Sequence, residues 1–233
     1  MQTDILTSAL GDELSDPALE MLRPAAVGFR ELEGGEDLED FSQDHLHLVC
    51  DGWVYQYATL SDGRWVITRL ATRGEMITPP RTGDDDAFAV AAMGSASVLV
   101  IDRAALSRLY RDNSIRNMML KRRRAEDDDN ARWHVMCMAG TAIERMAFLF
   151  LNLAERARRA GIAQGWSFPF PATQAHLAAL TGLSAVHTNR TLQVLRQKGL
   201  LNWDGRRVDI LAEDRLRALG SFSTADENLI TAV

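Results

Sequence analysis

The stretch from Thr173 to Leu201 decides the fold of the C-terminal part, and its sequence is TQAHLAALTGLSAVHTNRTLQVLRQKGLL. Thr173 is a residue type that caps helices, and apolar residues follow it at helical spacing. The segment 181–183 contains a central glycine and predicts a tight turn. Ser184 then begins a second helix, which we expect to end before Gly199. Helix, short glycine turn and helix together predict a helix-turn-helix.

The second predicted helix has two faces. One face is expected to pack on the first helix and carries Thr188, Thr191, Leu192 and Leu195. The other face carries Val186, Asn189, Arg190 and Gln193. Arginine pairs with guanine, asparagine and glutamine pair with adenine, and valine meets the thymine methyl group. We therefore predict that these four side chains contact DNA bases. The mid-helix Thr188 departs from the fully apolar residue more usual at such a core position.

Five side chains around this helix are candidates for phosphate contacts: Thr173, Ser184, His187, Arg206 and Arg207. The first three stand near helix N-termini, where hydroxyl and backbone N–H groups bind phosphate. The two arginines follow Asp204-Gly205, a hairpin turn signal between two short strand-like runs. This hairpin is expected to be a wing beside the helix. A winged helix that docks a protein instead of DNA remains the alternative.

The region 46–102 changes to short runs of β-branched and aromatic residues. Turn signals at Asp51-Gly52 and Ser61-Asp62-Gly63 separate these runs. The runs that we expect to be strands are 46–50, 53–57, 65–70, 88–92 and 97–102. Many short strands at regular spacing predict a small barrel or sandwich.

Helix is expected from 103 to 160, where there is no proline and a single glycine, Gly140. Asn113-Ser114 would cap a long helix, and a second, amphipathic helix would run from Thr141 to Ala160. The long helix is charged at its centre, from Lys121 to Asp129. This run is either a solvated, ion-paired surface or a basic strip that meets an acidic strip on a partner helix.

The composition is that of an ordinary soluble globular protein. Of 233 residues, 46% are hydrophobic and 25% are charged. No stretch reaches the roughly 18 apolar residues of a membrane span, and the N-terminus lacks a signal-peptide pattern, so we expect a cytoplasmic protein without a membrane partner. Net charge is −9 over residues 1–138 and +3 over residues 139–233. A basic C-terminal module suits an anionic partner, although chance variation between the halves is the alternative.

With these motifs in order, the chain resembles the Crp–Fnr family of bacterial transcription regulators. The resemblance rests on Gln174-Ala175-His176-Leu177-Ala178, Gly182-Leu183-Ser184, His187–Leu192 and Leu195–Leu200. It is most similar to a proteobacterial branch with a Val-His-x-Asn-Arg helix, here Val186 to Arg190. In that family the arginine matching Arg190 contacts guanine. The glutamate common two residues after the helix cap is replaced by Val186, so the half-site of better-known members does not carry over.

The resemblance implies an α+β fold in three parts. These are an N-terminal β-roll sensor over 1–112, which is a cyclic-nucleotide-binding-like jelly roll, a dimerisation helix over 113–138 and a C-terminal winged helix-turn-helix over 139–233. It also implies a homodimer, with double-stranded DNA and RNA polymerase as partners. Two recognition helices would enter successive major grooves of a palindromic operator.

The resemblance does not extend to known effectors, and we expect no cofactor or metal. Cyclic-nucleotide binders follow a Gly-Glu loop with an Arg-Ser/Thr-Ala run. Here Gly74-Glu75 leads into Asp84-Asp85-Asp86, and 88–91 occupy the place of the arginine. Two cysteines cannot supply the four thiolates of an iron–sulfur cluster. The chain shows no nucleophile–base pair or phosphate loop, so no enzyme is expected.

Two weaker features stay open. His45 and His47 share one side of a strand and could bind haem or a metal, although a partly exposed pair is the default. Cys137 lies beside His134 near the end of the long helix and is either a redox-sensing thiol or an inert cysteine. For the whole chain, the alternative function is a β-roll that binds a small molecule and a winged helix that docks a protein.

Overall fold

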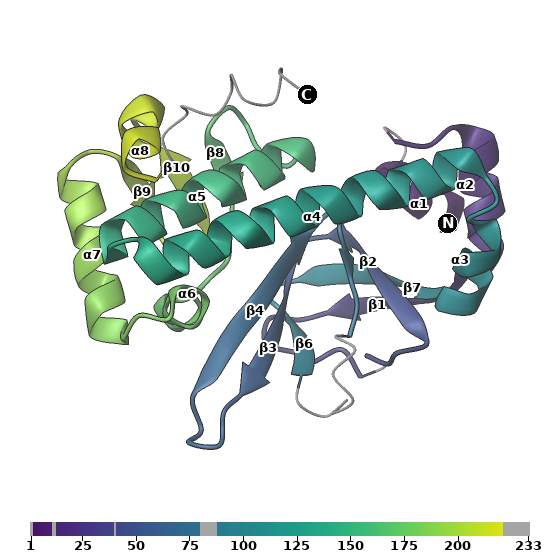
Figure 1. Cartoon of the computed structure of the whole chain (residues 1–233), viewed down its shortest axis with the longest axis horizontal. Helices are drawn as coiled ribbons and strands as arrows, with labels where there is room; N and C mark the ends of the chain where they lie inside the picture. Colours follow the sequence, from purple (N-terminus) through teal and green to yellow (C-terminus); the bar gives the residue numbers. More distant parts are fainter. Residues whose placement is uncertain (1, 11–12, 40, 80–87, 221–233) are drawn as a thin grey trace.

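The computed structural model describes residues 2–10, 13–39, 41–79 and 88–220. Figure 1 shows a strand-rich N-terminal part and a mainly helical C-terminal part, with one long helix running across both. The helices are α1 (Gln2–Leu10), α2 (Asp16–Leu22), α3 (Arg103–Leu109), α4 (Asn113–Ala139), α5 (Ala142–Arg159), α6 (Gln174–Thr181), α7 (Ala185–Gln197) and α8 (Glu213–Gly220), with a short 3-10 turn, η1 (Arg23–Ala25). The strands are β1 (Ala26–Leu32), β2 (His45–Asp51), β3 (Trp53–Thr59), β4 (Trp65–Thr72), β5 (Met76–Ile77), β6 (Phe88–Ala92), β7 (Ala96–Asp102), β8 (Ser167–Pro169), β9 (Leu201–Trp203) and β10 (Arg207–Ile210).

The N-terminal part is a β-roll of two antiparallel sheets. One sheet has the order β1-β7-β2-β5 and the other the order β4-β3-β6. Between them lies an apolar core formed by Leu32, Leu38, Val49, Val54, Ala71, Ile77, Val90, Ala92, Ala96 and Val98. The outer face of the first sheet is covered by α1, α2 and α3. The predicted turn at Gly63 is present, with a positive φ of 81°.

Strand β1 was not predicted. It pairs with β7 through a register shift between Ala26 and Gly28. Its sequence, AVGFREL, contains a glycine and two adjacent charged residues and so lacks a clean alternation. The predicted acidic loop Asp84-Asp85-Asp86 lies outside the described residues.

Helix α4 is the predicted long helix and begins at Asn113, but its cap lies one residue earlier than expected. Its cap is Asp112, whose carboxylate accepts hydrogen bonds from the backbone N–H groups of Ser114 (2.9 Å) and Ile115 (3.1 Å). A carboxylate at this position accepts hydrogen bonds from two N–H groups that have no partner within the helix. Its negative charge also stabilises the positive end of the helix dipole. The predicted cap at Asn113-Ser114 is therefore wrong by one position. Helix α5 begins after Thr141, which forms a capping box with Glu144.

The C-terminal part is a winged helix-turn-helix. Helices α5, α6, α7 and α8 pack beside a three-stranded sheet of order β8-β10-β9. The sequence predicted only the β9–β10 hairpin and assigned 168–171 to an extended lead-in. The structure places β8 in the sheet, where Phe168 lies opposite Val208. The predicted α+β architecture of β-roll, long helix and winged helix-turn-helix is confirmed.

The two parts share one hydrophobic core. Trp53, Tyr55, Ile67 and Leu70 of the sheet β4-β3-β6 belong to the same buried cluster as Phe150, Phe168, Phe170, Leu177, Leu192 and Leu195 of the C-terminal part. The ring of Trp53 contacts Phe170 edge to face at 5.4 Å. Gly94 lies so close to Pro171 that a Cβ there would be 2.7 Å from the proline Cγ. The orientation of the winged helix is therefore set by direct packing on the β-roll.

Candidate nucleic-acid interface

Local hydrogen bonds define both helices of the helix-turn-helix. The Thr173 hydroxyl accepts a hydrogen bond from the backbone N–H of His176 (3.1 Å), and His176 Nδ1 accepts one from the backbone N–H of Thr173 (3.0 Å). Gly182 ends α6 in the left-handed region, with φ of 68°. Ser184 then caps α7 by accepting a hydrogen bond from the N–H of His187 (3.3 Å). These are the helix boundaries that the sequence predicted.

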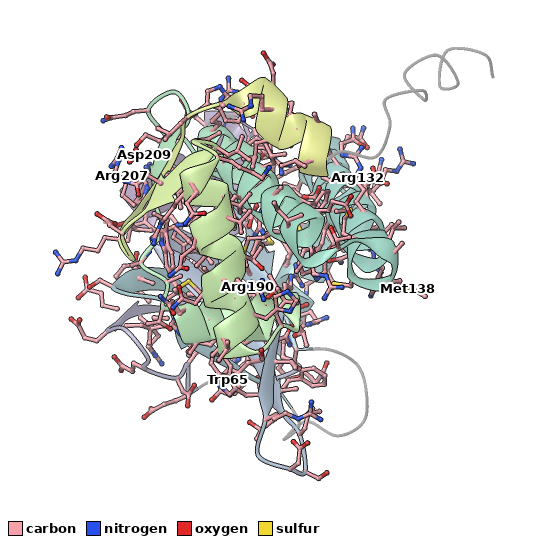
Figure 2. The ribbon with its side chains drawn as sticks, turned by 90° about the vertical axis from the view of Figure 1, so that its left-hand side faces the viewer. Trp65, Arg132, Met138, Arg190, Arg207 and Asp209 are labelled. Atoms are coloured by element: carbon pink, nitrogen blue, oxygen red, sulfur yellow. The ribbon has the colours of Figure 1, made fainter. Side chains whose placement is uncertain are left out.

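The two faces of α7 differ sharply in burial. The predicted packing face, formed by Thr188, Thr191, Leu192 and Leu195, is buried. On the predicted base-contacting face, Val186 is 81% exposed, Arg190 and Gln193 are exposed, and Asn189 is half-buried. In Figure 2 α7 runs along the side of the molecule that faces the viewer, with Arg190 on it. An exposed helical stripe of this composition suits the major groove.

The arginine of this face has no competing ion pair. Within the described residues, no carboxylate forms a salt bridge with Arg190. The guanidinium therefore keeps its donors for another molecule. His187, Thr173 and Ser184 are also exposed, and each threonine or serine hydroxyl keeps its hydrogen for a phosphate while its oxygen caps a helix.

The two predicted wing arginines have different surroundings. Asp204 shapes the turn by accepting hydrogen bonds from the backbone N–H groups of Arg206 and Arg207, both at 2.8 Å, and these bonds lower the pKa of its carboxyl. The Arg206 side chain is exposed. Arg207 is half-buried, donates from Nε to Ser167 Oγ at 2.6 Å, and lies 3.9 Å from Asp209. Arg206 is therefore available for phosphate, whereas Arg207 connects β10 to β8.

His176 has an additional role that the sequence did not reveal. Its ring lies 5.1 Å from that of Tyr55 and 5.8 Å from that of Trp65, so α6 rests on the β3–β4 hairpin. Burial lowers the pKa of His176. Its place in the capping box, three residues after Thr173, is a local signal. Its contact with the β-roll could not be predicted from the local sequence, because Tyr55 and Trp65 lie more than a hundred positions earlier in the chain.

An ion pair also connects the two parts. The Arg156 guanidinium of α5 donates to both carboxylate oxygens of Glu75 and, at 2.6 Å, to the carbonyl oxygen of Leu70. It also lies 5.8 Å from the centre of the Trp53 ring. Burial raises the pKa of the Glu75 carboxyl, but the charge and hydrogen bonds of Arg156 outweigh burial and leave the pKa below its usual value. The Gly74-Glu75 turn of the β-roll is thus connected to α5 of the C-terminal part of the same chain.

The cysteines and histidines named from the sequence lie apart from this interface. Cys50 is buried beneath α1 and α2, and burial raises the pKa of its thiol to about 11. Burial also raises the pKa of Cys137, which disfavours a reactive thiolate. His45 and His47 share one side of β2, but His47 is buried and His45 is half-buried. In the described part of the chain, no three histidine, cysteine or carboxylate side chains gather into a possible metal site.

Residues 144–219 match the Crp-like helix-turn-helix domain family, so this part of the chain is a domain of that class. Together with the β-roll and α4, it forms the architecture of the Crp/Fnr transcription regulators. None of the helices in the described residues has the length and apolar character needed to cross a membrane.

Solved structures of such regulators superimpose over most of their length. FixK2 from Bradyrhizobium japonicum is 23% identical with a TM-score of 0.70, covering 84% of this chain and 98% of that one. A CooA mutant from Carboxydothermus hydrogenoformans is 15% identical with a TM-score of 0.65, covering 93% and 95%. TTHB099, a CRP-family transcriptional regulator from Thermus thermophilus, is 18% identical with a TM-score of 0.62, covering 83% and 97%. No curated protein matches the sequence.

Proposed function

We propose that the protein is a sequence-specific DNA-binding transcription regulator that binds a palindromic operator as a homodimer. The observation that carries this proposal is the exposed face of α7. It presents two amide side chains, one apolar side chain and an arginine that forms no salt bridge within the described residues, on a helix whose opposite face is buried in the core. This combination of a rigid support and exposed hydrogen-bonding groups suits recognition of base edges.

Each residue of the interface has a proposed role. Arg190 pairs with guanine through two donors, Asn189 and Gln193 contact adenine, and Val186 packs on a thymine methyl group. Thr173, Ser184, His187 and Arg206 contact phosphates and set the position of the helix on the duplex. Arg207 was predicted to do the same, but its bond to Ser167 supports a structural role in the wing.

The homodimer places two copies of α7 one helical turn of DNA apart. The exposed side of α4 supplies the surface for a second copy, since it runs the length of the molecule (Figure 1). A regulator of this kind acts by positioning RNA polymerase or by blocking it, and we propose the polymerase as a further partner. The proposed role is regulatory and not enzymatic.

We further propose that neither cyclic nucleotide nor an iron–sulfur cluster controls the protein. The Gly74-Glu75 turn supports this, because both oxygens of the Glu75 carboxylate accept hydrogen bonds from the chain's own Arg156. A ligand hydroxyl would have to displace a charged partner at that position. Cys50 and Cys137 lie in separate environments, one beneath α1 and α2 and one near Arg145.

The test is selection of bound sequences from a random duplex pool with the full-length protein. We expect enrichment of a two-fold palindrome, and we expect Arg190→Ala to lose sequence preference. Arg215→Ala is the matched control, because Arg215 is an exposed arginine of α8 on the same domain. Absence of any enriched sequence, or an unchanged profile for Arg190→Ala, would instead support a winged helix that docks a protein.

A further inference from the structure

His176 lies where the helix-turn-helix meets the β-roll. It stands in the first turn of α6 and is half-buried. Its ring lies 5.1 Å from that of Tyr55 on β3, and it is perpendicular to the ring of Trp65 on β4, with the centres 5.8 Å apart. Figure 2 shows Trp65 below α7 and Arg190, on the side of the molecule that carries the candidate interface. The first turn of α6 thus rests on the β3–β4 hairpin on the proposed DNA-binding side.

One hydrogen bond fixes the protonation state of this ring. His176 Nδ1 accepts a hydrogen bond of 3.0 Å from the backbone N–H of Thr173, so the neutral ring carries its proton on Nε2. A second proton could enter only at Nδ1, where it would break this bond. It would also place a cation at the N-terminal end of α6, which the helix dipole makes positive. The capping box therefore requires a neutral imidazole.

The hairpin side of the ring offers no charge that stabilises an imidazolium. Burial raises the pKa of the Tyr55 and Tyr57 phenols, so both are neutral near pH 7. The Tyr57 hydroxyl donates to the carboxylate of Asp37 at 3.0 Å. Burial lowers the pKa of His176 below its ordinary value of 6.5, and neither Asp37 nor another charged group of the described residues contributes to this shift.

The charged side chains of the other elements packed on α6 form contacts of their own or are exposed. The contacts are Arg64 with Asp62 at the hairpin turn (2.7 Å), Arg69 of β4 with Glu126 of α4, and Arg145 of α5 with the carbonyl oxygen of Thr181 at the far end of α6 (2.8 Å). His187 and Arg190 of α7 are exposed. Helix α6 itself, QAHLAALT, carries no other titratable side chain. An imidazolium at position 176 would therefore lack a carboxylate partner among the described residues.

The proposed function gives Thr173 a phosphate contact, and the inference rests on it. His176 holds Thr173 through two bonds, because Nδ1 accepts from the Thr173 N–H and the Thr173 hydroxyl accepts from the His176 N–H at 3.1 Å. We infer that the neutral imidazole of His176 is a positioning residue that holds Thr173 for its phosphate contact, and that protonation at Nδ1 releases Thr173 and weakens DNA binding. Acidification thus lowers the affinity of the protein for its operator.

The direction of this pH effect follows from the two states of the ring. The held state keeps His176 neutral, whereas a released, hydrated ring has the ordinary pKa of 6.5. The released state therefore takes up a proton first as pH falls below 6.5. Its population relative to the held state rises by up to about tenfold for each unit between the two pKa values. The Glu75–Arg156 pair keeps its charges in this range, because the pKa of Glu75 lies below 4.5.

Fluorescence anisotropy with the duplex enriched from the random pool measures the effect in the full-length protein. We expect wild type and His176→Gln to have similar dissociation constants at pH 7.5, because glutamine is also an acceptor at the third position of a capping box. At pH 5.5 the constant of the wild type should exceed that of His176→Gln at least about threefold, since glutamine does not titrate. His176→Ala lacks the acceptor and should bind about threefold more weakly than His176→Gln at both pH values.

A second histidine supplies the matched control. His45→Gln removes a titratable ring of β2 that lies apart from the candidate interface, with Nδ1 3.0 Å from the Ser42 hydroxyl. This variant should keep the pH profile of the wild type. The exposed His187 is present in every variant, so the comparison removes its contribution. Far-ultraviolet circular dichroism at both pH values checks that each variant is folded.

A nuclear magnetic resonance titration of the five histidines measures the ring without DNA, and His176→Gln identifies its signal. We expect a pKa below 6.5. A value above 6.5 would show that the attraction of an imidazolium to the rings of Tyr55 and Trp65 outweighs burial, and it would overturn the inference. Parallel pH profiles for wild type and His176→Gln would also overturn it, while DNA binding stands. A selection that enriches no duplex would instead refute the proposed function, and the phosphate contact of Thr173 with it.

Discussion

The indole Nε1 of Trp53 donates a hydrogen bond of 2.8 Å to the carbonyl oxygen of Pro169, a residue 116 positions further along the chain. Trp53 begins β3 of the β-roll, and Pro169 ends β8 of the winged helix. The bond lies at the junction of the two parts, next to the contact of the indole with Phe170. The winged helix-turn-helix is thus held against the β-roll of the same chain.

Replacing this donor should weaken the junction. Trp53→Phe keeps an aromatic ring but removes the partner of the Pro169 carbonyl at a part-buried site, so we expect a loss of about 1 kcal/mol in the free energy of unfolding. Urea denaturation measures it. Trp65→Phe is the control, because the Trp65 indole makes ring contacts but no described hydrogen bond. Equal losses for the two variants would show that ring size, and not the bond, matters.

The Glu75–Arg156 pair should make the free energy of unfolding depend on pH in the acidic range. The pKa of Glu75 lies below its ordinary value of 4.5 in the folded state, so the pair contributes stability above pH 4.5, and the contribution is lost as pH falls through the folded-state pKa. Glu75→Gln should cost about 2 kcal/mol at pH 7, since Arg156 keeps only a neutral partner. The difference in the free energy of unfolding between wild type and Glu75→Gln should shrink below pH 4.5. Urea denaturation at a series of pH values measures this difference. A constant difference would contradict this account.

The two wing arginines should separate experimentally. Arg206→Ala removes an exposed cation, so we expect DNA affinity to fall similarly for all sequences and the salt dependence of binding to lose about one phosphate contact. Arg207→Ala breaks the bond to Ser167 and should lower the unfolding temperature more than it alters the salt dependence. Fluorescence anisotropy at several salt concentrations, together with thermal denaturation, measures both. A larger change in salt dependence for Arg207→Ala, with a larger fall in unfolding temperature for Arg206→Ala, would show that Arg207 contacts phosphate and Arg206 supports the wing.

Thr188 offers a stabilising substitution. Its side chain is fully buried in the packing face of α7, and its hydroxyl has no hydrogen-bond partner among the residues that the structure describes. Thr188→Val removes that unpaired group at nearly constant shape, so we expect a gain of about 1 kcal/mol with unchanged DNA affinity. Thr191→Val is the control, because the Thr191 hydroxyl donates to the carbonyl oxygen of His187 at 2.8 Å. A Thr188→Val variant less stable than wild type would refute the expectation.

Much of the architecture was predictable because its signals are local. The caps at Thr173 and Ser184, the stop at Gly199 and the wing turn at Asp204 each act within a few residues, and all are present. The cap of α4 was misplaced because Asp112, Asn113 and Ser114 are all good capping residues. Only the backbone conformation shows which of them lies just before the first helical residue. Strand β1 was missed because its stability comes from β7, far along the chain.

The candidate site was predictable to the same extent. Helical spacing alone placed Val186, Asn189, Arg190 and Gln193 on one face, and the structure leaves that face exposed. Spacing could not distinguish Arg206 from Arg207, because the difference depends on Ser167, which lies forty positions earlier. Base and phosphate contacts remain predictions until DNA binding is measured.

The amino-acid sequence by itself determined the helix-turn-helix, its caps and the side chains that share the exposed face of α7, since these depend on short-range hydrogen bonds and on helical periodicity. Only the tertiary structure decided which charged side chains form ion pairs within the chain and how the β-roll is joined to the winged helix. Trp53 with Pro169 and Glu75 with Arg156 are partners 116 and 81 residues apart. No local pattern selects such partners, because they meet only when the β-roll and the winged helix bury a common core.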